Sequence, residues 1–130
     1  MRAIRWMMLA LLLPLLAGCG YNKIQQQDEA VKAQWSEVLN QYQRRADLIP
    51  NLVKTVQGYA THEEKVLTEV TNARARVGSA GITAEQAADP AKLAAFQAAQ
   101  GELSSALGRL LVVTENYPDL KANQNFLELQ

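Results

Sequence analysis

The stretch RRADLIPNLVKTVQGYATHE, residues 44–63, decides the fold of this chain, because an apolar pattern with helical spacing runs through it without changing phase. The pattern alternates steps of four and three residues, the repeat of a helix that packs against partner helices. Its positions are Val31, Trp35, Val38, Tyr42, Arg45, Ile49, Leu52, Val56, Tyr59, Glu63, Val66, Val70, Ala73 and Val77. We therefore predict one long helix that continues to Val77, in a chain of all-α class.

Pro50 is the one interruption of this helix. Proline has no N–H to donate, and its ring collides with the carbonyl group four residues earlier, at Ala46. Asp47 could instead cap a new helix that begins at Leu48, which would place Pro50 in a tolerated first turn. The unbroken apolar register favours a kink at Pro50 with continued direction. Gly58 is a second, weaker point of flexibility.

Two charged residues, Arg45 and Glu63, occupy positions of the apolar stripe, where an unpaired charge is costly. We expect each to meet an opposite charge on a neighbouring helix. The alternative is functional: Arg44, Arg45, Asp47 and Glu63 around the kink at Pro50 would form a charged cleft that holds a peptide or an anion.

A second long helix is predicted after the helix-breaking sequence GSAG that follows Val77. Asp89 and Pro90 have the residue types of an N-cap and a first helical turn, and the apolar pattern then continues to about Asn116. Thr83 is suited to cap one short turn before this helix.

Glu115 lies at the C-terminal end of this second helix, where the helix dipole disfavours a negative charge. We therefore expect a cationic partner for it, with Arg45 as one candidate. Residues 117–119 then form a turn, and residues 121–130 begin a further helix. Its apolar anchors are Phe126, Leu127 and Leu129.

The N-terminus has the plan of a secretory signal peptide: a basic start, the apolar run WMMLALLLPLLA, and two small residues before Cys19. The uncharged stretch has about 16 residues, fewer than the roughly 20 that a membrane-spanning helix needs. We therefore predict a signal peptide in preference to a permanent span.

Residues 16–19, Leu-Ala-Gly-Cys, resemble the lipobox of bacterial lipoproteins. The resemblance implies that Cys19 is the first mature residue and carries a diacylglycerol, usually with an N-acyl chain. Stable anchoring needs at least two such chains. The alternative is an unmodified cysteine at the end of a membrane anchor. We expect a signal peptide over residues 1–18, a tether over 19–28 and a helical domain over 29–130.

Composition limits the chemistry of the chain. The 13 basic and 13 acidic residues balance, whereas nucleic-acid binding needs a concentrated basic surface, so no nucleic acid is expected. His62 is the only histidine, and the sequence HEEKV lacks the second histidine of a HExxH zinc site. We expect no metal, no cofactor and no enzymatic activity.

Three segments together resemble the LemA family: residues 44–63, ARARVG at 73–78 and ENYPDLKANQNFLELQ at 115–130. The resemblance covers roughly residues 24–130. It implies an antiparallel, up-and-down bundle of about four long helices, attached to a bacterial membrane, with no established enzymatic activity. It also implies that the family continues with a further long helix. We therefore expect either a truncated chain or a groove that another chain fills.

An uncovered groove has an energetic consequence. About five or six large apolar side chains, at about 1.5 to 3 kcal/mol each, would roughly equal the stability of a whole domain. We expect the chain alone to be loose or oligomeric. The predicted function is a lipid-anchored scaffold of the bacterial cell membrane or outer membrane, with its domain outside the cytoplasm, that binds other envelope proteins or a second copy of itself.

Overall fold

The computed structural model describes residues 1–129, without the side chains of residues 2, 13, 15–19 and 129. The predicted lipidation of Cys19 and the predicted anchor at Leu129 therefore lie outside the described side chains. The elements are α1 (Arg2–Tyr59), α2 (Glu64–Ser79), the 3-10 helix η1 (Gln86–Ala88), α3 (Pro90–Thr114), α4 (Pro118–Lys121) and α5 (Gln124–Leu129). The predicted all-α class is confirmed, since no strand occurs in residues 1–129.

The chain divides into two units, residues 1–35 and residues 36–130. The first unit is the N-terminal part of α1, in which Lys32 pairs with Asp28 at 2.9 Å and with Glu29 at 3.8 Å. These pairs join residues about one helical turn apart, so they stabilise α1 locally. Within the described residues, no helical segment combines the length and the apolar character needed to cross a bilayer.

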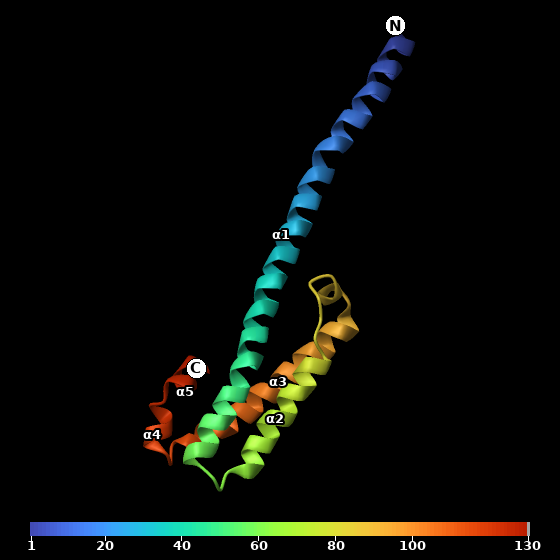
Figure 1. Ribbon diagram of the computed structural model, residues 1–130. Coiled ribbons are helices and arrows are strands. Elements are labelled where there is room, and N and C mark those ends of the chain that lie inside the picture. The colour runs from blue at the N-terminus through green and yellow to red at the C-terminus, as the bar shows by residue number, and fades with distance from the viewer. Residues whose placement is uncertain (130) are drawn as a thin grey trace. The chain divides into compact units, whose positions relative to one another are not determined.

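The second unit is a helical bundle. The C-terminal part of α1 descends to a short turn, α2 runs back antiparallel to it, and α3 lies alongside α2 (Figure 1). A short connection between two helices makes them antiparallel neighbours, as in up-and-down bundles. Two ion pairs on the surface, Arg76 with Glu102 and Arg109 with Glu69, join α2 to α3.

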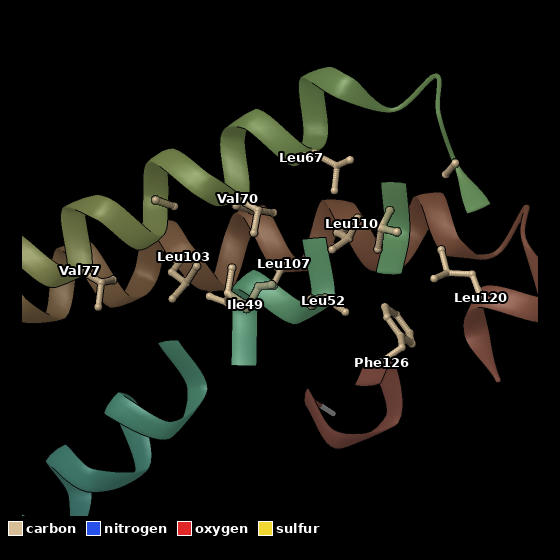
Figure 2. Packing of buried hydrophobic residues seen from close by; sticks show 14 of the residues in the cluster. Ile49, Leu52, Leu67, Val70, Val77, Leu103, Leu107, Leu110, Leu120 and Phe126 are labelled. Atoms are coloured by element: carbon tan, nitrogen blue, oxygen red, sulfur yellow. The ribbon is translucent and has the colours of Figure 1, made fainter. Parts of the chain in front are cut away.

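One apolar core holds this unit together, and Figure 2 shows the side chains of its helices converging on it. Its large members are Ile49, Leu52 and Val56 from α1, Leu67, Val70 and Val77 from α2, Leu103, Leu107 and Leu110 from α3, Leu120 from α4 and Phe126 from α5. The members from each long helix recur every three or four residues, so each helix directs one apolar stripe inward.

The prediction of one helix through Val77 is wrong, because α1 ends at Tyr59 and α2 begins at Glu64. The turn between them keeps the Ala60 N–H bonded to the Val56 carbonyl at 2.8 Å. Since α1 and α2 face the same core, the apolar stripe keeps its phase although the chain reverses direction. A four-residue turn therefore replaces about one helical turn without disturbing the pattern.

The predicted start of the second long helix is confirmed. The Asp89 carboxylate accepts hydrogen bonds from the N–H groups of Ala91, at 3.0 Å, and Lys92, at 3.4 Å, and Pro90 is the first residue of α3. The predicted short turn is η1. It is closed by Thr83, whose N–H donates to Gln86 Oε1 at 3.0 Å while its hydroxyl accepts from the Gln86 N–H at 3.3 Å.

The C-terminal segment returns to the core through α4 and α5. Phe126 is 1% exposed, as predicted for an anchor, whereas Leu127 is half exposed and is not one. Figure 2 shows Phe126 and Leu120 at the same end of the core as Leu110. The Asn125 side-chain amide donates to Thr55 Oγ1 at 3.0 Å and joins α5 to α1.

Candidate functional site

Pro50 lies within α1, which continues through it to Tyr59. The structure therefore agrees with continued direction and not with a new helix at Leu48. Because Pro50 has no N–H, the carbonyl oxygen of Ala46 lacks its usual helical donor. Arg74 of α2 supplies a replacement, since its Nε donates to this oxygen at 2.9 Å. The acceptor that Pro50 leaves free in α1 is thus used for a hydrogen bond between α1 and α2.

Arg45, one turn before Ile49, is half-buried and donates from Nη2 to the Ser104 hydroxyl of α3 at 2.8 Å. Burial lowers the pKa of the Arg45 guanidinium, and the neighbouring Tyr42 acts in the opposite direction.

The predicted pairing of Arg45 with Glu115 is wrong. Glu115 does have the predicted cationic partner, but it is Lys121, whose Nζ lies 3.0 Å from both carboxylate oxygens.

The other residues of the predicted charged cleft are dispersed. Asp47 accepts a hydrogen bond from the Gln43 side chain at 2.9 Å on the exposed side of α1, and Arg44 is also exposed. Glu63 lies in the turn before α2 and not in the middle of an apolar stripe. The structure therefore does not gather Arg44, Arg45, Asp47 and Glu63 into one cleft around Pro50.

A hollow lined by residues of α1, α2, α3 and the loop after α2, which we call the α1–α3 hollow, was not predicted from the sequence. Its wall contains Tyr42 and Phe96, whose rings meet edge to face with centroids 5.3 Å apart and planes at 87°. The full lining is Leu39, Tyr42, Gln43, Ala46, Arg74, Ala75, Val77, Gly78, Gly81, Ile82, Phe96 and Gln100.

Gln100 is the unusual member of this lining, because it is only 6% exposed. Among the described residues, neither its Oε1 nor its Nε2 has a hydrogen-bond partner. Most buried polar side chains in proteins are paired, so an unpaired amide calls for an explanation. The position of Gln100 in the sequence does indicate its burial. It stands four residues after Phe96 and three before Leu103, in the apolar stripe of α3.

A separate groove, which we call the α3–α5 groove, has Arg45 in its wall. Its lining is Arg45, Ser104, Leu107, Gly108, Leu110, Leu111 and Phe126. Val112 follows the lining residue Leu111 and is 71% exposed, and Leu127 follows the lining residue Phe126 and is 50% exposed. In the part of the chain that the structure describes, no group of three or more His, Cys, Asp and Glu residues is placed to hold a metal ion.

Comparison with known protein families matches residues 34–130, well over half of the chain, to the LemA family. The chain belongs to the LemA family. The matched range begins two residues before the second structural unit and includes its whole bundle, so the LemA domain is the part of the chain that contains both the hollow and the groove. No curated protein matches the chain.

Proposed function

We propose that this LemA-family protein is a lipid-anchored helical interaction protein of the bacterial envelope. The observation that carries the proposal is the sequence Leu-Ala-Gly-Cys at residues 16–19, placed directly after a basic and apolar N-terminus. A diacylglycerol and an acyl chain on Cys19 would hold the protein on a membrane, since two chains anchor stably where one does not.

The bundle supports a role in binding other proteins. Leu111, Val112 and Leu127 expose apolar surface on and next to the α3–α5 groove. Apolar groups clustered beside a groove are typical of surfaces that bind another chain. Envelope proteins and a second copy of this chain are the partners that we propose for this surface.

We propose a role without catalysis, because the charged side chains that the sequence singled out serve as contacts within and between helices. Arg45 bonds to Ser104 across two helices, and Glu115 pairs with Lys121 across a turn. General acid–base chemistry instead needs titratable groups that converge on one reacting position.

Mass spectrometry of the protein extracted from bacterial membranes tests the anchor. We expect a mature chain that begins at Cys19 and carries the mass of a diacylglycerol and an acyl chain. Cys19→Ser should abolish both the processing and the membrane association, while Tyr21→Ala, a control in the tether, should leave both unchanged. A mature wild-type chain with an unmodified Cys19 would contradict the proposal.

Site-specific photo-crosslinking in intact cells tests the interaction surface. A photoreactive residue at Val112 should trap a partner protein, whereas one at Ala98, exposed at the other end of α3, should not. Equal trapping at the two positions would argue against a dedicated surface at the α3–α5 groove.

One observation favours a second candidate function, the binding of a peptide or anion near Pro50. The residues first considered for such a site are dispersed, but Arg74 lines the α1–α3 hollow beside Ala46. Within residues 1–129, no carboxylate pairs with Arg74. A binding function would therefore use the hollow and not the predicted cleft.

A further inference from the structure

Arg45 places a positive charge in the wall of the α3–α5 groove without a countercharge. Its side chain is half-buried, and its Nη2 donates to the hydroxyl of Ser104, a second lining residue, at 2.8 Å. Among the residues whose side chains are described, no carboxylate pairs with this guanidinium. A guanidinium forms its strongest, charge-assisted hydrogen bonds with a carboxylate. The groove therefore favours a partner that brings a negative charge to Arg45.

Gly108 leaves open space in the same groove. It lies four residues after Ser104 and three before Leu111, so these three lining residues share one face of α3. A Cβ atom at Gly108 would meet no atom within 4 Å. Leu111 and Val112, which follow it, expose apolar side chains. The face thus has a recess with apolar projections beside it, a shape against which another helix can pack closely.

Glu115 continues this face of α3, four residues after Leu111. Its carboxylate pairs with Lys121 at 3.0 Å, and both side chains are exposed. Exposed ion pairs contribute little to stability, and an ionised carboxylate accepts several hydrogen bonds. Glu115 can therefore accept hydrogen bonds from a further cation without a large loss.

The spacing of these residues makes the face complementary to itself. Ser104, which holds Arg45, precedes Gly108 by four residues, and Val112 follows it by four. When two α3 helices cross antiparallel at Gly108, the Ser104 side of each lies against the Val112 side of the other. Glu115 of each copy then lies toward the end where the other copy holds Arg45. A two-fold interface needs both members of every contact on one face, and this face supplies them.

We propose that the α3–α5 groove binds a second copy of this chain. The two α3 helices pack antiparallel about a two-fold axis near Gly108, with Leu111 and Val112 of each copy in the groove of the other. Arg45 of each copy pairs with Glu115 of the other copy, so the dimer contains two identical ion pairs. This dimer uses the interaction surface of the proposed function, on which it rests, and its partner is the chain itself.

The test is photo-crosslinking in intact cells that produce two differently tagged copies of the full chain. A photoreactive residue at Val112 of one copy should trap the other copy. Arg45→Glu in both copies, or Glu115→Lys in both, places like charges at both contacts and should lower the trapped fraction at least about fivefold. When one copy carries Arg45→Glu and the other Glu115→Lys, both contacts join opposite charges again. Trapping should then recover to at least about half of the wild-type fraction.

Matched variants separate this contact from a general effect of charge. Glu102→Lys makes the same change as Glu115→Lys on the same helix, and it also removes an exposed ion pair, with Arg76, but lies outside the groove lining. Arg44→Glu makes the same change as Arg45→Glu at an exposed neighbouring position. Both variants should trap the second copy like the wild type.

A steric variant tests the groove without changing any charge. Gly108→Met fills the open space from which the second copy is bound, and it should lower the trapped fraction at least about fivefold. The fold accepts this side chain, because no atom lies within 4 Å of the added Cβ and glycine is a poor helix former. Circular dichroism of the purified variant should therefore match that of the wild type. Ala98→Met adds the same side chain at the exposed other end of α3 and should leave trapping unchanged.

Three results would overturn the dimer: no second copy trapped from Val112, wild-type trapping by Glu115→Lys, and wild-type trapping by Gly108→Met. If Val112 traps a different envelope protein and no second copy, the dimer is wrong and the proposed interaction function stands. If Val112 traps no protein, both are wrong for this surface.

Discussion

Arg74 donates a hydrogen bond from Nε to the carbonyl oxygen of Ala46 at 2.9 Å, and this oxygen is the acceptor that Pro50 leaves without a helical donor. A residue of α2 thereby completes the hydrogen bonding of α1. Ala46 is only 8% exposed, so its carbonyl has little access to solvent. The proline is tolerated inside α1 because the neighbouring helix compensates for it.

The first prediction concerns this bond. Arg74→Met should lower the free energy of unfolding by about 1 to 3 kcal/mol, because it leaves a buried carbonyl unpaired. Urea denaturation followed by circular dichroism measures the change. Arg76→Met, two residues along the same helix, removes only an exposed ion pair with Glu102 and should cost no more than about 1 kcal/mol.

A double-mutant cycle isolates the cause. Pro50→Ala restores an N–H that can donate to the Ala46 carbonyl within α1. In that background Arg74→Met should therefore cost clearly less than in the wild type, with a coupling of about 0.5 to 3 kcal/mol. Equal costs of Arg74→Met in the two backgrounds would show that the proline and the arginine act independently.

The second prediction concerns the stability of the core near Gln100. Gln100→Met removes an amide that is buried without a partner among residues 1–129, so it should raise the free energy of unfolding by about 1 to 3 kcal/mol. Gln97→Met on the exposed side of α3 should change it by less than about 0.5 kcal/mol. A lower free energy of unfolding in Gln100→Met would contradict this prediction, because it would show that the Gln100 amide gains hydrogen bonds when the protein folds.

The sequence predicted features that depend on neighbouring residues along the chain. The Asp89 and Pro90 start of α3 and the Thr83 turn follow from capping chemistry within four residues, and both were found. Glu115 was expected to have a cationic partner because of its place at a helix end, and Lys121 lies only six residues away.

Features that depend on tertiary placement were missed. The apolar periodicity does not reveal the turn after Tyr59, because the apolar stripes of α1 and α2 have the same spacing and both face one core. The partner of Arg45 was wrong for a similar reason: Ser104 lies close to it only after α1 and α3 have packed. Arg74 was given no role, since nothing in the sequence places it beside Ala46.

The third prediction tests the cap of α3. Asp89→Ala removes the acceptor of two backbone N–H groups and should lower the free energy of unfolding by about 1 kcal/mol, within a range of about 0.5 to 2. Asp89→Asn keeps an oxygen acceptor at the same place and should cost much less. Thermal or urea unfolding compares the two, and equal losses would mean that the charge matters more than the hydrogen bonds.

The fourth prediction concerns the apolar surface at the α3–α5 groove. If a second copy covers it, the midpoint of thermal unfolding should rise with protein concentration, since association stabilises by mass action. Val112→Glu should then reduce this concentration dependence and shift sedimentation toward the monomer. Its effect on the folded monomer should stay within about 0.5 kcal/mol, because Val112 is 71% exposed.

The matched control for this surface is Ala98→Glu, which adds the same charge to an exposed position of α3 away from the groove. It should leave both the sedimentation and the concentration dependence unchanged. A sharp, concentration-independent transition of a monomeric wild-type chain would rule out self-association. In that case we expect a different envelope protein to cover Leu111, Val112 and Leu127, because exposed apolar side chains gain free energy from leaving water. Crosslinking at Val112 would identify that protein.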